Sequence, residues 1–207
     1  MLKTLPNLLT LSRIAVIPLV VGTFYLDHPW NAWLGGSLFA AACVTDWLDG
    51  HFARRWQQIS AFGRFLDPIA DKLLVSMILM MLVAFNRLSA PTLFPALVIL
   101  AREILVSGLR EFLAGLRVRV PVSQLAKWKT GIQMGAIGVL LVSGALPASA
   151  QIELAGEALL WLAALLTLVT GYDYLTHGLT HMEAEDAKPK PAAPTPAVPQ
   201  KTADGVG

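Results

Sequence analysis

Six stretches of the chain are long and apolar enough to cross a membrane as helices. A helix rises about 1.5 Å per residue, so about 20 apolar residues cover the hydrocarbon of a bilayer. Turn formers such as Asp27-His28-Pro29 and Ser89-Ala90-Pro91 separate the stretches. The predicted spans are roughly residues 8–26, 32–55, 66–86, 92–114, 125–146 and 154–178. The pattern therefore predicts an all-α integral membrane protein with six transmembrane helices.

The end of the chain departs from this pattern. Beyond about Glu183 the sequence AEDAKPKPAAPTPAVPQKTADGVG is rich in Pro, Ala and charge. Such a segment has no apolar face to bury, so it is expected to stay disordered. We predict one transmembrane domain over residues 1–182 and a Pro/Ala-rich tail over residues 183–207.

Composition agrees with a membrane protein. Hydrophobic residues make up 55% of the chain and charged residues 14%, and the mean hydropathy is +0.59, outside the usual soluble range. A formal net charge of +2 is too small to indicate a nucleic-acid partner. The single cysteine, Cys43, excludes a disulfide within the chain.

The basic residues of the short connections predict the orientation. One side carries only Arg87, and the other carries Lys3, Arg54, Arg55, Arg64, Arg117, Arg119, Lys127 and Lys129. Since Lys and Arg are enriched in cytoplasmic loops, the second side is predicted to face the cytoplasm, together with both chain ends.

Four aspartates cluster between the second and third spans, in TDWLDGHFARRWQQISAFGRFLDPIADK. Asp46 and Asp49 are three residues apart, and Asp67 and Asp71 are four apart, so each pair shares a helix face. Four carboxylates in a poorly hydrated site require cations. Hard oxygen ligands suit Mg²⁺ or Mn²⁺, and such ions commonly bring phosphates with them. The cluster therefore predicts a metal-dependent site for a diphosphate at the cytoplasmic interface.

Simpler interpretations exist for single members of this segment. A lone aspartate near a helix end is usually a cap, and Asp67-Pro68 alone is typical of a helix start. Arg54 and Arg55 could merely anchor the chain at the membrane surface. Gly50 and Gly63, in contrast, flank the acids and would let a phosphate approach the backbone.

The spacing also resembles a known family. Asp46-x-x-Asp49-Gly50-x-x-Ala53-Arg54, eight residues, and Gly63-x-x-x-Asp67-x-x-x-Asp71 are similar to the signature of the CDP-alcohol phosphatidyltransferases. The resemblance implies six membrane helices, a homodimer and a metal ion. It also implies roles for the motif residues: Asp46, Asp49 and Asp67 as metal ligands, Asp71 as general base that also touches the metal site, and Gly50, Ala53 and Arg54 as the lining of the CDP pocket.

The fourth span carries two arginines in AREILVSGLREFLAGL. Arg102 and Arg110 are eight residues apart, which puts them on about the same side of a helix. Charge inside a span is costly and usually functional. With Lys127 or Lys129, the arginines would form a receptor for a second phosphate, so a phosphorylated alcohol is the expected acceptor. The alternative is structural pairing of the arginines with Glu103 and Glu111.

Three segments narrow the resemblance to bacterial members that use glycerol 3-phosphate: PNLLTLSRI, AREILVSGLRE and VSQLAKWKTGIQM. The likeness covers about residues 5–178. It implies that Asn7, Thr10 and Arg13 stand near the nucleotide, although Asn7 and Thr10 could instead cap the first helix.

The resulting expectation is a multi-pass enzyme of the bacterial inner membrane with its active site facing the cytoplasm. It would join CDP-diacylglycerol to sn-glycerol 3-phosphate, giving phosphatidylglycerol phosphate and CMP. Alternatives are a phosphatidyltransferase for another phosphorylated polyol such as inositol phosphate, a membrane prenyltransferase, and a divalent-cation transporter. Against the transporter, the acids cluster at one interface and not at the midplane.

Overall fold

The protein is all helical wherever its structure is described. The computed structural model describes residues 5–56, 61–115 and 124–186, and these ranges contain six α-helices, two short 3₁₀ turns and no strand. The elements are α1 (Leu5–Thr23), α2 (Trp30–Trp56), α3 (Ala61–Ala84), η1 (Ala90–Thr92), α4 (Leu93–Gly115), α5 (Gln124–Val142), η2 (Ser143–Ala145) and α6 (Ser149–Asp186).

Each of the six predicted spans overlaps one α-helix, with boundaries that differ by up to eight residues, and two of the differences matter for the predictions. Helix α3 begins at Ala61, so Asp67 and Pro68 lie inside the helix and the helix-start interpretation of that pair is wrong. Helix α6 continues to Asp186, four residues beyond the predicted domain boundary at residue 182. The rest of the predicted tail, residues 187–207, lies outside the described residues, and its disorder stays a prediction.

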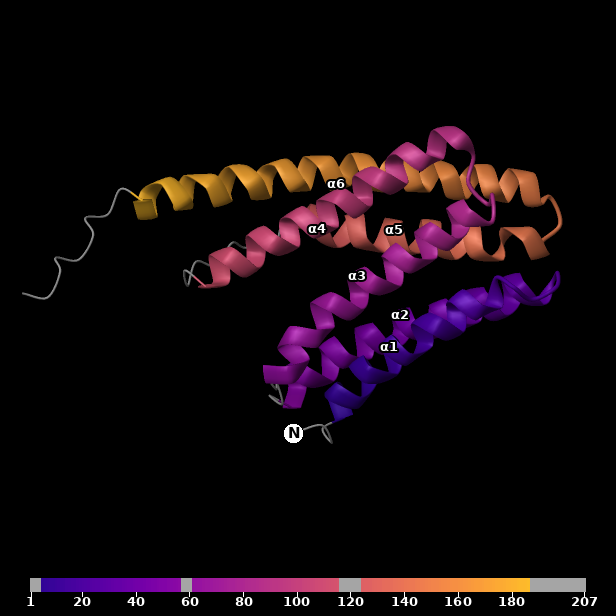
Figure 1. The fold of residues 1–207 in the computed structure, drawn as a ribbon, viewed down its shortest axis with the longest axis horizontal. Helices are drawn as coiled ribbons and strands as arrows, with labels where there is room; N and C mark the ends of the chain where they lie inside the picture. Colours follow the sequence, from indigo (N-terminus) through magenta and orange to yellow (C-terminus); the bar gives the residue numbers. More distant parts are fainter. Residues whose placement is uncertain (1–4, 57–60, 116–123, 187–207) are drawn as a thin grey trace, which may run out of the picture.

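The helices form two groups of three (Figure 1). Helix α1 packs on α2 and α3, while α6 packs on α5 and α4, and contacts between α2 and α5 join the groups. One continuous apolar core runs through both groups; its most buried members include Val20, Leu82, Ile99, Leu140 and Leu160. In Figure 1, α3 and α4 diverge toward the end at which α2, α4 and α6 finish.

At the opposite end, polar side chains tie the helices together. Glu157 of α6 accepts hydrogen bonds from the Ser89 amide at 2.6 Å, the Ser89 hydroxyl at 2.7 Å and the Thr92 hydroxyl at 2.9 Å. Arg87, the cation predicted to stand alone on this side, donates to the Leu140 carbonyl at 3.2 Å. These contacts anchor this end of the bundle, while the helices diverge at the other end.

Two of the described helical segments are long and apolar enough to cross a membrane. They are Ala90–Gly115 and Ser149–Thr180, and a shorter apolar helix covers Thr10–Thr23. Many large apolar side chains on the bundle are exposed, including Leu105 and Leu168, which is typical of a lipid-facing surface. The structure thus supports a membrane protein. The six-span topology stays a prediction, because only these two of the described helical segments are long and apolar enough to cross.

Candidate active site

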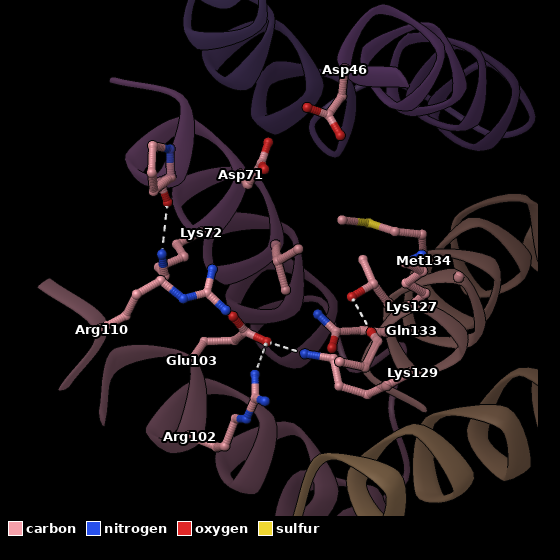
Figure 2. Close-up of a pocket in the computed structure, with 15 residues that line it drawn as sticks. Asp46, Asp71, Lys72, Arg102, Glu103, Arg110, Lys127, Lys129, Gln133 and Met134 are labelled. Carbon is pink, nitrogen blue, oxygen red and sulfur yellow. Dashed lines mark hydrogen bonds and ion pairs between the residues drawn. The ribbon is translucent and has the colours of Figure 1, made fainter. Parts of the chain in front are cut away.

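A pocket of about 580 Å³ lies between helices α2, α3, α4 and α5 (Figure 2). Its charged lining residues are Asp46, Asp71, Lys72, Arg102, Glu103, Arg110, Lys127 and Lys129. Figure 2 shows Asp46 and Asp71 in the upper part of the view, Arg102 and Lys129 beside Glu103 in the lower part, Lys72 and Arg110 on the left and Lys127 on the right. The part around the two aspartates is called the acidic side, and the part with the arginines and lysines is called the basic side. The pocket therefore offers carboxylates to a cation on one side, and lysines and arginines to an anion on the other.

On the acidic side, the two aspartates share a single guanidinium. Asp46 comes from α2 and Asp71 from α3, and Arg13 of α1 lies between them. Arg13 Nη1 is 2.8 Å from Asp46 Oδ1 and 2.5 Å from Asp71 Oδ1. Arg13 is 1% exposed, whereas the aspartates are about half exposed toward the pocket. Because both oxygens contact one nitrogen, the carboxylates of two different helices are close neighbours.

Thr10 and Asn7 cannot cap the first helix. Helix α1 already includes Leu5, so both residues lie within it, and the capping interpretation is wrong. Thr10 is almost fully buried, one helical turn before Arg13. The side chain of Asn7 lies outside the described residues. Its predicted place near the nucleotide, like that of Thr10, stays a prediction.

Only part of the aspartate motif is described at the level of side chains. Asp49, Gly50, Ala53, Arg54 and Asp67 lie within α2 and α3, but their side chains are outside the described residues. The described motif residues are Asp46, Asp71 and Gly63, and Gly63 is buried near the start of α3.

The described acids alone do not make a metal site. Among the side chains that the structure describes, no three acidic, histidine or cysteine groups are placed to hold a metal ion. The backbone nevertheless places Asp49 one turn after Asp46 on α2, and Asp67 one turn before Asp71 on α3. A pair of close carboxylates with two more acids one turn away fits the oxygen donors that Mg²⁺ or Mn²⁺ requires. The assignment of these four residues as ligands stays a prediction.

On the basic side, Glu103 is bound by two cations. Its Oε1 accepts a hydrogen bond from Lys129 Nζ and lies 3.3 Å from Arg102 Nη1. Arg102 also donates from Nη2 to the Thr170 hydroxyl of α6 at 3.3 Å. The pairing of Arg102 with Glu103, which the sequence left as an alternative to phosphate binding, is therefore confirmed. Both groups still line the pocket.

Helix α6 packs against the side chain of Arg102. Gly171 packs so closely on Arg102 that a Cβ at this glycine would lie 3.1 Å from Arg102 Cγ. The missing side chain lets the stem of Arg102 lie against α6 while its guanidinium reaches the pocket. Gly171 and Thr170 thus position Arg102 from α6, a role that could not be predicted from the sequence.

Arg110 and Lys127 differ from Arg102 because neither has a carboxylate partner within the described ranges. Both side chains are exposed and line the pocket. The Arg110 guanidinium lies over the Tyr174 ring, 5.5 Å from its centroid, and the alternative pairing of Arg110 with Glu111 is not found there. These two cations are placed to meet an anionic ligand.

Three further lining residues were missed or left undecided by the sequence. Lys72 follows Asp71 on α3, and its Nζ donates to the Pro68 carbonyl at 3.0 Å. Lys129 was an equal alternative to Lys127; it is 3% exposed and is the one that binds Glu103. Gln133 lies one turn after Lys129 on α5 and is 2% exposed. The four-residue spacing of Lys129 and Gln133 was the only signal in the sequence that linked them.

The helical bundle brings aspartates of two different helices to one pocket, as the aspartate motif predicted. The chain belongs to the CDP-alcohol phosphatidyltransferase family, whose model matches residues 3–169. The resemblance seen in the aspartate motif is thereby confirmed.

Curated relatives narrow the comparison. The chain is 49% identical to the CDP-diacylglycerol--glycerol-3-phosphate 3-phosphatidyltransferase of Rickettsia bellii (strain RML369-C), over 83% of this chain and 93% of the relative. The protein of that name from Escherichia coli (strain K12) is 45% identical over the same shares. A cardiolipin synthase (CMP-forming) of Oryza sativa subsp. japonica is 42% identical, over 81% of this chain and 55% of the relative.

Proposed function

We propose that this protein transfers the phosphatidyl group of CDP-diacylglycerol to sn-glycerol 3-phosphate, giving phosphatidylglycerol phosphate and CMP. The names of the Rickettsia and Escherichia relatives support these substrates. The observation in the structure that carries the proposal is the division of one pocket into an acidic side and a basic side. With a metal ion bound, the acidic side would hold the diphosphate of the donor. The basic side would hold the phosphate of the acceptor.

The four aspartates Asp46, Asp49, Asp67 and Asp71 would hold Mg²⁺ or Mn²⁺. When bound, the ion would neutralise charge on the diphosphate and make CMP a better leaving group. Arg13 supplies one positive charge between Asp46 and Asp71. Because one guanidinium cannot balance four carboxylates, the acidic side favours additional cations.

Asp71 is proposed as the general base. Its carboxylate faces the pocket, opposite the basic side that would hold the acceptor (Figure 2). The acceptor hydroxyl gives its proton to Asp71 while its oxygen bonds to the phosphorus that carries the lipid. The bond from that phosphorus to the CMP oxygen breaks, and CMP leaves with the electron pair. Arg13 holds Asp71 in place for this step.

The basic side is proposed to bind the phosphate of the acceptor. Arg102 and Lys129 are largely engaged with Glu103, so Arg110 and Lys127 are the cations best placed for a direct contact, with Lys72 beside them. Guanidinium groups favour two-point contacts with phosphate. Serine or choline as acceptor would leave these charges without a partner.

The topology completes the proposal. We place six helices across the bacterial inner membrane, with the pocket open to the cytoplasm. The lysine and arginine side chains that line the pocket support this orientation, because such residues are enriched on the cytoplasmic side. A homodimer is part of the proposal because the resemblance to the family implies it. Gly50, Ala53, Arg54 and Gly63 are proposed to line the CDP pocket with Asn7 and Thr10.

An acceptor panel tests the function. Purified protein is given CDP-diacylglycerol with Mg²⁺ or Mn²⁺, and CMP release is measured with glycerol 3-phosphate, inositol phosphate, serine or phosphatidylglycerol. We expect release with glycerol 3-phosphate, and its loss when the metal is chelated. Release only with phosphatidylglycerol would favour the activity named for the Oryza relative. Metal flux in liposomes without any CMP release would favour a transporter.

A further inference from the structure

Gln133 is a buried side chain in the pocket whose acceptor atom is unused. It is 2% exposed and lines the pocket from α5. Its Oε1 has no hydrogen-bond partner among the described residues. A buried acceptor without a donor is unfavourable, so such an atom beside a cavity is suited to a ligand donor.

The position of Gln133 indicates which part of a ligand it would meet. Gln133 is six residues beyond Lys127 on α5, and Glu103 is seven residues before Arg110 on α4. At 1.5 Å per residue, Gln133 lies about 9 Å along α5 from Lys127, and Glu103 lies about 10.5 Å along α4 from Arg110. A phosphate bound by Arg110 and Lys127 would therefore direct the rest of the acceptor toward Gln133.

The chemistry of Glu103 and Gln133 also points to a hydroxyl. Glu103 already accepts from Lys129 and Arg102, while Gln133 Oε1 accepts from no described group. Figure 2 shows Gln133 on the same side of the pocket as Lys129 and Glu103, across from Asp46 and Asp71. Glycerol 3-phosphate has two hydroxyls, and only the terminal one forms the new bond. The other hydroxyl needs an acceptor.

We propose that Gln133 determines acceptor specificity by accepting a hydrogen bond from the secondary hydroxyl of glycerol 3-phosphate. This inference rests on the proposed function, because it concerns the acceptor of that reaction. Gln133 touches substrate but takes no part in proton transfer. It selects for a polyol phosphate over a phosphorylated alcohol that has only the reacting hydroxyl.

A substrate analogue and a variant together test the proposal. The analogue is 3-hydroxypropyl phosphate, which keeps the phosphate and the terminal hydroxyl but lacks the secondary hydroxyl. We expect the unaltered protein to show a kcat/KM about 10- to 100-fold higher for glycerol 3-phosphate than for the analogue. Gln133→Met keeps the length of the side chain and removes the acceptor. It should lose this preference through weaker use of glycerol 3-phosphate, with the analogue unaffected.

Two further variants separate specificity from structure. Gln133→Glu keeps an acceptor oxygen at this position and should keep a preference for glycerol 3-phosphate. Gln124→Met, on the exposed start of α5, is the matched control and should behave like the unaltered protein. The KM for CDP-diacylglycerol should not change in any of the variants.

The outcomes distinguish the two proposals. Equal use of glycerol 3-phosphate and the analogue by the unaltered protein would overturn the role of Gln133 while leaving the proposed function intact. An equal loss of kcat/KM for both acceptors in Gln133→Met would also overturn the role of Gln133, because an equal loss indicates a structural role. No CMP release with either acceptor, but release with another alcohol, would overturn the proposed function itself.

Discussion

Replacing Arg110 with alanine should weaken the binding of glycerol 3-phosphate and leave CDP-diacylglycerol unaffected. Arg110 lines the pocket and has no carboxylate partner within the described residues. Its guanidinium lies over the Tyr174 ring, 5.5 Å from the ring centroid. The substitution therefore removes a cation from the acceptor side without leaving a buried charge unpaired.

The expected size of the effect follows from the exposure of Arg110. A hydrogen bond to a charged group contributes about 1.5–3 kcal/mol. The side chain is exposed, so water and salt screen it, and we take a smaller contribution of about 1–2 kcal/mol. The KM for glycerol 3-phosphate should then rise by about 5- to 30-fold.

Steady-state kinetics, with each substrate varied in turn, measures the effect. Arg110→Lys should restore part of the affinity, because it keeps the charge but loses the planar fork. Glu111→Gln is a matched control, since Glu111 is exposed on the same helix and does not line the pocket. A defect of Arg110→Ala confined to CDP-diacylglycerol, or no defect at all, would show that Arg110 does not bind the acceptor phosphate.

Three other changes have defined outcomes. Asp71→Asn should lower kcat by about 10²- to 10⁴-fold with little effect on CDP-lipid binding; equal losses in both would indicate a metal ligand only. Gly171→Ala should raise the acceptor KM by only about 2- to 3-fold, because the new Cβ would lie 3.1 Å from Arg102 Cγ and shift that side chain slightly; Gly135→Ala, with no atom within 4 Å, should not. Glu157→Gln should lower the free energy of unfolding by about 1–2 kcal/mol while kcat/KM stays unchanged, measured by thermal unfolding in detergent.

The six helices could be predicted from the sequence because each one is a largely apolar stretch bounded by turn formers. The start of α3 could not, because Asp67-Pro68 is a strong local signal for a helix start. The helix nevertheless begins at Ala61. Pro68 lacks an amide hydrogen, and its carbonyl accepts from the Lys72 side chain of the same helix at 3.0 Å. The helix thus runs through this pair and overrides its capping preference.

The aspartates of the acidic side were predicted better than Arg13, the cation that lies between them. Spacings of three and four residues place Asp46 with Asp49, and Asp67 with Asp71, on one face of their helices. A hairpin of the second and third spans then predicts that the two pairs meet in one site. Arg13 could be expected near the pocket only by resemblance. That it lies between the two aspartates depends on how α1 packs against α2 and α3, and no spacing within one helix contains that information.

On the basic side, too, the roles of single residues depend on how the helices pack. Lys127 and Lys129 are two residues apart, so they point about 200° apart around a helix and cannot play the same role. The sequence left the choice open, and the packing of α5 decides it, since Lys129 is buried against Glu103 while Lys127 is exposed. The buried lysine neutralises Glu103, so that carboxylate does not repel an incoming phosphate. The exposed lysine keeps its charge for the ligand, and the alternation of buried and exposed positions along α5 thereby divides structural from binding cations.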